Sequence, residues 1–182
     1  MKRSLFTIMI LIISACGGSS SNENSESNTE GASSNGDNAD NNVEVFALQN
    51  IRFDAQDFYN GETISITQNT PFEVQWVSPT SAAYSINLHL TTNNQPHNVT
   101  NKVFGIKCGS ETFSLCPNAT GQVDCEINDN NLTCAIGSDF LGSENFQVSD
   151  QASLSVIIEG CNAMNSCDLK TFSISLQSNT AD

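Results

Sequence analysis

Two segments decide the fold of this chain: Phe72-Glu73-Val74-Gln75-Trp76 and Tyr84-Ser85-Ile86-Asn87-Leu88. In each segment an apolar side chain alternates with a polar one. Successive side chains of a β-strand point to opposite faces of the sheet, so the alternation predicts strands with one buried face. Pro79, between the two segments, predicts a turn. We therefore expect two consecutive strands that place Trp76 and Tyr84 in a hydrophobic core.

The same alternation recurs through the rest of residues 43–178. No part of that range keeps the 3.6-residue apolar period of a helix for long. The further segments with a strand pattern are 45–53, 63–67, 103–108, 123–127, 132–136, 154–158 and 172–176. Turn-forming segments rich in Asn, Pro and Gly separate them. The sequence therefore predicts a single all-β domain, a sandwich or a barrel, over residues 43–178.

Residues 62–91 resemble part of the immunoglobulin-like and fibronectin type III domains. The markers are Phe72-x-Val74-x-Trp76, then Pro79, then Tyr84-x-Ile86-x-Leu88. The resemblance implies an immunoglobulin-like antiparallel β-sandwich, in which the tryptophan packs into the core and the next strand contributes the tyrosine. The cysteines from Cys108 onward do not belong to the fibronectin pattern, so the resemblance leaves the strand topology open.

Six cysteines follow Cys16 in the sequence. An even number of cysteines in an exported chain indicates a disulfide framework. Spacing alone does not choose among the possible pairings, but strand register narrows them. If Ile127 pairs with Leu132, Cys125 lies directly opposite Cys134, and the apolar residues of both strands share one face. We therefore predict a disulfide between Cys125 and Cys134.

The last two predicted strands follow the same logic. Pairing Cys161 with Cys167 places the apolar residues of 154–158 opposite those of 172–176, so that all of them share one face. This register predicts a second disulfide, which closes the neck of the loop between the two strands.

By elimination, Cys108 pairs with Cys116. The domain is then disulfide-stapled, and residues 128–131 and 162–166 become closed, exposed tips. A loop whose shape is fixed in advance loses less entropy on binding. These two tips are therefore the first places where we expect a partner contact.

The N-terminal segment predicts export. Lys2 and Arg3 precede an apolar run over residues 5–13. That run is too short for a membrane-spanning helix, which needs about 20 apolar residues. A positive start followed by a short apolar run is typical of a cleavable signal peptide, here residues 1–15.

The segment Ile13-Ser14-Ala15-Cys16 resembles the lipobox of bacterial lipoproteins. The resemblance implies that Cys16 receives diacylglycerol, that cleavage occurs before Cys16, and that acyl chains anchor the protein in a membrane. In the enterobacterial sorting rule, an Asp after the cysteine retains a lipoprotein in the inner membrane. Gly17 stands at that position, which implies the outer membrane. The alternative is an ordinary secretory signal in which Cys16 is incidental.

Residues 16–42 predict a disordered tether, because they contain no aromatic and no branched aliphatic residue that could be buried. Removing residues 1–15 takes away Lys2 and Arg3, so the net charge falls from −14 to −16. A chain this acidic is repelled by phosphate backbones. We therefore expect no nucleic-acid partner.

No pattern in the sequence predicts catalysis or a cofactor. Alternation turns His89 away from the core and His97 follows a proline in a loop, so we expect both side chains to be solvated. The chain contains no Gly-x-Ser-x-Gly motif and no Cys-x-x-Cys motif. Acidic residues lie between Asp54 and Glu62 and at Asp129, but they do not follow the EF-hand loop. We predict no enzyme activity, no metal and no cofactor.

The interpretation that the sequence favours is an outer-membrane lipoprotein that presents a β-sandwich as a recognition or adhesion module for a protein or glycan. Loops on a rigid scaffold are the usual place for such contacts. A structural or assembly component of the envelope, docked to another membrane protein by a strand edge or a loop, is the alternative. A hydrolase is the least favoured of the three.

Overall fold

The computed structural model describes residues 45–92 and 95–179. The predicted signal peptide (1–15), the predicted lipidation site Cys16 and the predicted tether (16–42) lie outside these residues. The described strands are β1 (Gln49–Phe53), β2 (Gln56–Asp57), β3 (Thr63–Thr67), β4 (Phe72–Val77), β5 (Tyr84–Thr91), β6 (Lys102–Cys108), β7 (Thr120–Asn128), β8 (Asn131–Ile136), β9 (Asp139–Asn145), β10 (Ser155–Asn162) and β11 (Cys167–Gln177). One short 3-10 helix, η1 (Val148–Ser153), lies between β9 and β10. Nothing helical in these ranges has the length and apolarity needed to cross a bilayer.

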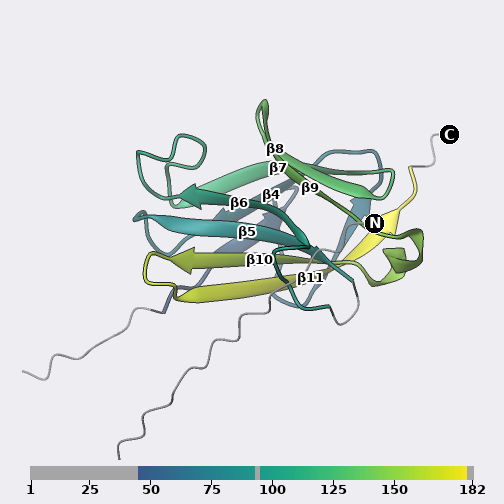
Figure 1. Cartoon of the computed structure of the whole chain (residues 1–182), viewed down its shortest axis with the longest axis horizontal. Coiled ribbons are helices and arrows are strands. Elements are labelled where there is room, and N and C mark those ends of the chain that lie inside the picture. Colours follow the sequence, from purple (N-terminus) through teal and green to yellow (C-terminus); the bar gives the residue numbers. More distant parts are fainter. Residues whose placement is uncertain (1–44, 93–94, 180–182) are drawn as a thin grey trace, which may run out of the picture. The chain divides into compact units, whose positions relative to one another are not determined.

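The strands form two sheets that pack face to face (Figure 1). Sheet A has the strand order β2-β1-β4-β7-β8-β9, and sheet B has the order β3-β11-β10-β5-β6. The predicted all-β sandwich is therefore confirmed. One pairing departs from the predicted antiparallel arrangement, because β3 lies at the edge of sheet B beside β11 and runs parallel to it. The preceding strand, β2, belongs to sheet A, so the chain crosses from one sheet to the other before β3 pairs with β11.

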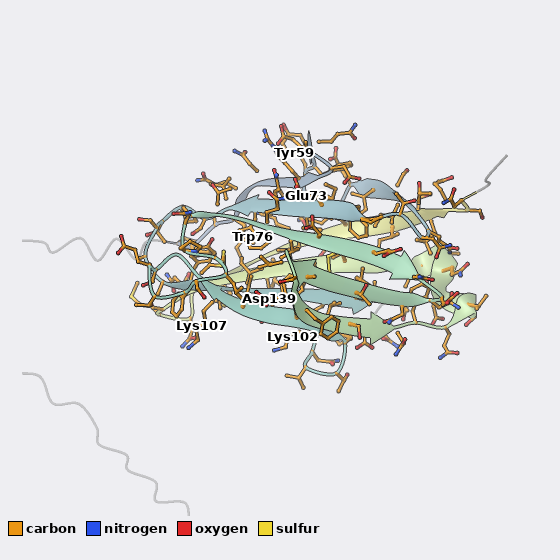
Figure 2. All side chains as sticks on the ribbon, turned by 90° about the horizontal axis from the view of Figure 1, so that it is seen from above. Tyr59, Glu73, Trp76, Lys102, Lys107 and Asp139 are labelled. Carbon is orange, nitrogen blue, oxygen red and sulfur yellow. A yellow bond between two sulfur atoms is a disulfide. The ribbon has the colours of Figure 1, made fainter. Side chains whose placement is uncertain are left out.

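Trp76 is the largest fully buried side chain of the core, and Figure 2 labels it. Its Nε1–H donates a hydrogen bond to the hydroxyl of Tyr84 at 3.2 Å. The Tyr84 hydroxyl in turn donates to the carbonyl oxygens of Asn118 and Ala119, each 3.0 Å away. Gly121 lies opposite Trp76 in sheet A, and a Cβ at that position would come within 2.2 Å of the indole. The missing side chain therefore makes room for the indole.

Strand β9 is an element that the sequence analysis did not find. None of its residues is fully buried, and their polarity does not alternate. Its position depends on Gly142, where a Cβ would lie only 1.9 Å from the carbonyl oxygen of Val103 in β6. Since β9 belongs to sheet A and β6 to sheet B, this close approach brings the edges of the two sheets together along one side of the sandwich.

Candidate functional site: the disulfide-closed loops

Three disulfides join strands or loops that are close in sequence. The pairs are Cys108–Cys116, Cys125–Cys134 and Cys161–Cys167. Their pairing is the one that strand register and elimination gave, and Ile127 lies opposite Leu132 as that register required. In antibody domains the disulfide connects the two sheets. Here the two disulfides that link strands each lie within one sheet.

The tip of the β7–β8 hairpin differs from its prediction. The connection is a two-residue turn, Asp129 and Asn130, with φ of 49° and 61°, in place of a four-residue loop. Asp and Asn tolerate this left-handed region better than most residues. The carbonyl of Asn130 accepts a hydrogen bond from the N–H of Phe146 at 2.9 Å, and its side-chain oxygen accepts one from Gln151 at 2.8 Å. Phe146, just before η1, and Gln151, within η1, therefore cover part of this tip, which is not the free loop that we expected.

The tip of the β10–β11 hairpin is exposed, in line with the sequence analysis. The side-chain oxygen of Asn162 accepts hydrogen bonds from the N–H groups of Met164 and Ser166, at 3.0 and 2.9 Å. These two bonds fix the turn from within, and the Met164 side chain is 73% exposed. The disulfide between Cys161 and Cys167 closes the neck of the loop on the outer face of sheet B.

Three loops gather at one end of the sandwich, on the left in Figure 1. They are the β4–β5 loop (78–83), the β6–β7 loop (109–119) and the β10–β11 loop (163–166). We call this region the loop end. The Cys108–Cys116 disulfide closes the first part of the second loop, and the Cys161–Cys167 disulfide closes the third. Two of the three loops therefore have their shape fixed by a covalent bond.

A groove of about 340 Å³ opens between these loops. Its lining includes Ala83, Ser85, Lys107, Phe113, Asn162 and Asn165. These side chains offer an aromatic ring, a cation and two amides, but the lining includes no histidine and no carboxylate that could act as a general base. A larger hollow of about 480 Å³ lies beside β3 and η1, yet its lining offers neither an aromatic ring nor a charge. The loop-end groove therefore presents groups that can stack, donate hydrogen bonds and carry a positive charge.

Three of the acidic residues considered for calcium, Asp54, Asp57 and Glu62, are engaged within the chain. A carboxylate oxygen of Asp54 accepts a hydrogen bond from the N–H of Glu73 at 2.8 Å. Asp57 forms an exposed ion pair with Arg52 at 2.6 Å. Glu62 accepts a backbone N–H at 2.7 Å. These carboxylates stabilise turns and strand ends, and they do not converge on a common point.

His89 is buried, which corrects the prediction that it is solvated. Alternation placed it on the correct face, pointing away from the core, but the β5–β6 loop folds over that face. The side chain of His89 is 5% exposed, whereas that of His97 in the covering loop is 32% exposed. Burial lowers the pKa of His89, because the charged imidazolium loses its hydration; contacts with Asn101 and Asn98 act in the opposite direction. His89 is therefore uncharged at neutral pH.

No protein-family model matches the chain, and no curated protein matches it either. A fold by itself does not imply a function, which depends on individual sites. Two such sites stand out in this molecule: the loop-end groove and the covered His89 on the outer face of sheet B.

Proposed function

We propose that the protein is an outer-membrane lipoprotein that presents its β-sandwich as a non-catalytic recognition or adhesion module. In this proposal a protein or glycan partner binds at the loop end. The observation that carries the proposal is the groove between two disulfide-closed loops. The membrane anchor rests on the lipobox-like segment Ile13-Ser14-Ala15-Cys16.

Rigid loops suit recognition for an energetic reason. A mobile loop loses conformational entropy when it closes on a partner, at roughly 0.5–1.5 kcal/mol for each side chain that becomes fixed. The loop end has lost much of that freedom on folding, because two disulfides and the hydrogen bonds of Asn162 fix the backbone. The Phe113 ring can stack on an apolar or sugar face, while Lys107 and the asparagines can form hydrogen bonds.

The direct test is binding of the full chain to glycan and matrix-protein arrays. We expect a ligand whose binding is reduced at least 10-fold by Phe113→Ala. The matched control is Phe140→Ala, because Phe140 is 69% exposed on β9, away from the groove lining. Absence of any binding above background, or an equal loss in both variants, would reject the loop end as the recognition surface.

A separate test concerns the anchor. Replacing Cys16 by alanine should release the protein from the membrane fraction or leave it as an unprocessed precursor, since no acyl chain can then be attached. Cell fractionation with immunoblotting measures this. Normal membrane retention of the mature Cys16→Ala protein would remove the basis for an outer-membrane lipoprotein, whatever the loop end binds.

A further inference from the structure

A cluster of nitrogen and oxygen donors lies on the outer face of sheet B, under the β5–β6 loop. His89 is on β5, Glu159 is on the neighbouring strand β10, and His97 comes from the loop. The Nε2 of His89 lies 3.9 Å from one carboxylate oxygen of Glu159, and the Nε2 of His97 lies 3.5 Å from the other. The two imidazole rings meet edge to face, with centroids 5.2 Å apart. Three side chains, from two neighbouring strands and a loop, therefore lie close together.

The hydrogen bonds around His89 decide which of its ring nitrogens carries the proton. Nδ1 lies 3.1 Å from the carbonyl oxygen of Asn98 and 3.3 Å from the side-chain oxygen of Asn101. The orientation of the Asn101 amide is fixed, because its oxygen accepts the N–H of Asn98 and its nitrogen donates to the carbonyl of Pro96. Both groups that face Nδ1 are therefore acceptors, so Nδ1 carries the hydrogen. The lone pair of the neutral ring is then on Nε2.

That lone pair has no partner within the chain. The Nε2 of His89 is buried and makes no hydrogen bond to any described residue. It faces a carboxylate that also has only lone pairs to offer, at a distance too long for a hydrogen bond. A buried acceptor without a donor costs free energy unless a ligand satisfies it. An imidazole whose Nδ1–H is held by carbonyl oxygens and whose Nε2 is free is the arrangement found in metal-binding histidines.

Glu159 is held in place as the third donor. One of its carboxylate oxygens accepts a hydrogen bond from the side-chain amide of Asn87 at 2.8 Å. Within the described residues its ion-pair partners are the two histidines alone, with no Lys or Arg among them. Its negative charge is therefore available to a cation at the point between the imidazoles.

We propose that His89, His97 and Glu159 bind one divalent transition-metal ion of the zinc type, with Asn101 and Asn87 as positioning residues. Two imidazoles and one carboxylate are a ligand set that Zn²⁺ accepts, with a fourth position left for water or a partner group. Donor atoms around a tetrahedral Zn²⁺ lie about 3.3 Å apart. The 3.5 and 3.9 Å separations run to different oxygens of Glu159, and no choice of one donor atom from each of the three residues brings all of them within 4.8 Å of one another. Closing the site therefore requires the imidazole of His97 to move toward that of His89. The His97 side chain can make this movement, because it is 32% exposed and lies on a loop. The sequence predicted no metal, because it contains no Cys-x-x-Cys motif and its acidic residues do not follow the EF-hand loop.

A neighbouring set of donors does not compete for the ion. Glu159 also lies near the sulfur atoms of Cys161 and Cys167, with one donor atom of each residue within 4.8 Å of the others. Those sulfur atoms form a disulfide and are not thiolates, so they are not available as zinc ligands. The proposed site does not depend on the recognition function, because none of its three ligands lines the loop-end groove.

The test uses the full chain, produced without a histidine tag and freed of metal with a chelator. Isothermal titration with Zn²⁺ at physiological salt should give one site per chain. His97→Ala and Glu159→Gln should each weaken binding at least 10-fold. Both residues are partly exposed, so neither substitution threatens the fold, and circular dichroism checks this. The matched control is Glu126→Gln, which removes the same charge from the outer face of sheet A and should leave Zn²⁺ affinity unchanged.

Asn101 tests the positioning role separately. Asn101→Ala should weaken Zn²⁺ binding about 10–100-fold, whereas Asn101→Asp keeps the acceptor for the Nδ1–H of His89 and should retain most of the affinity. Co²⁺ supplies an independent readout, because an ordered site of imidazole and carboxylate ligands gives it a visible spectrum that His97→Ala should abolish. No Zn²⁺ binding, or binding that His97→Ala and Glu159→Gln leave unchanged, would overturn the proposal. An equal loss in Glu126→Gln would also overturn it and point to diffuse binding by acidic residues.

Discussion

In the β7–β8 hairpin the disulfide points into the core, whereas in the β10–β11 hairpin it lies on the outer face of sheet B. Cys125 and Cys134 are 2% and 1% exposed, while Cys161 is half-buried and Cys167 is exposed. The tip of the first hairpin is partly covered by η1 and the residue Phe146 before it, and the tip of the second is open to solvent. Both hairpins have two directly opposed cysteines in alternating strands, yet one disulfide fills the core and the other shapes a surface loop.

The difference follows from the phase of each cysteine relative to its apolar neighbours. Cys125 is two residues from Ile127, so it shares the inward face of β7. Cys161 is three residues from Ile158, so it lies on the opposite face of β10. A one-residue change in spacing therefore decides whether a disulfide adds to core packing or constrains a surface loop.

Replacing Cys125 and Cys134 together by alanine should have the largest effect, lowering the unfolding free energy by about 4–5 kcal/mol. About 2–3 kcal/mol comes from freeing the unfolded chain, and about 1 kcal/mol from each buried sulfur whose removal leaves a void. Urea unfolding followed by the fluorescence of Trp76, the single tryptophan, measures the change. If this variant loses no more unfolding free energy than the Cys161/Cys167 double-alanine variant, the inward position of the first disulfide adds no stability.

Replacing Cys161 and Cys167 together by alanine should lower the unfolding free energy by about 2–3 kcal/mol, the contribution of chain restriction alone. The exposed sulfur of Cys167 leaves no cavity. The same urea titration applies, and binding at the loop end should weaken because the loop is no longer fixed. Unchanged ligand affinity in this variant would show that the disulfide does not contribute to ligand binding.

Tyr84→Phe should lower the unfolding free energy by about 2 kcal/mol, because the buried Nε1–H of Trp76 loses its acceptor. Tyr84 connects the two regions under comparison. It pairs with Asn162 at the end of β10, and its hydroxyl reaches the carbonyls just before β7. Urea unfolding is again the measurement, and a cost below about 0.5 kcal/mol would show that a water replaces the hydroxyl.

The same hydroxyl predicts a dependence on alkaline pH. Burial raises the pKa of Tyr84, because the phenolate would lose its hydration; the hydrogen bond from Trp76 acts in the opposite direction. The folded-state pKa of Tyr84 exceeds the unfolded-state value of about 10. The stability that the buried, neutral hydroxyl contributes is therefore complete below about pH 10 and is lost as the pH rises through the folded-state pKa. Phenolate absorbance in a Tyr59→Phe variant should therefore appear together with unfolding. Phenolate formation near pH 10 in the folded domain would contradict the burial.

Gln151→Ala should have the smallest effect, about 0.5–1 kcal/mol, because it removes one half-buried hydrogen bond to Asn130. Hydrogen exchange should become faster at the turn of the first hairpin and remain unchanged at the second. Met164→Ala, in the exposed second tip, is the control and should change stability by less than about 0.5 kcal/mol. Equal exchange at the two tips before any substitution would show that the covering segment gives no protection.

Most of the strands, their inward faces and the disulfide pairing could be predicted from the sequence alone. Alternation placed Trp76 and Tyr84 in the core, and register paired Cys125 with Cys134. These are local properties, because a strand has a period of two residues and a one-residue slip would bring every apolar side chain to the wrong face. Such features are encoded within a few residues of where they appear.

Contacts between segments distant in sequence determine which outward positions are covered. His89 has the sequence pattern of a solvated residue, but the β5–β6 loop covers it. The turn at Asn130 has the composition of a free tip, but Phe146 and Gln151 bind to it. Strand β9 has no alternation and lies where it does because Gly142 allows contact with the other sheet. Alternation specifies the face of a sheet on which a side chain lies, whereas a segment distant in sequence decides whether water reaches that side chain.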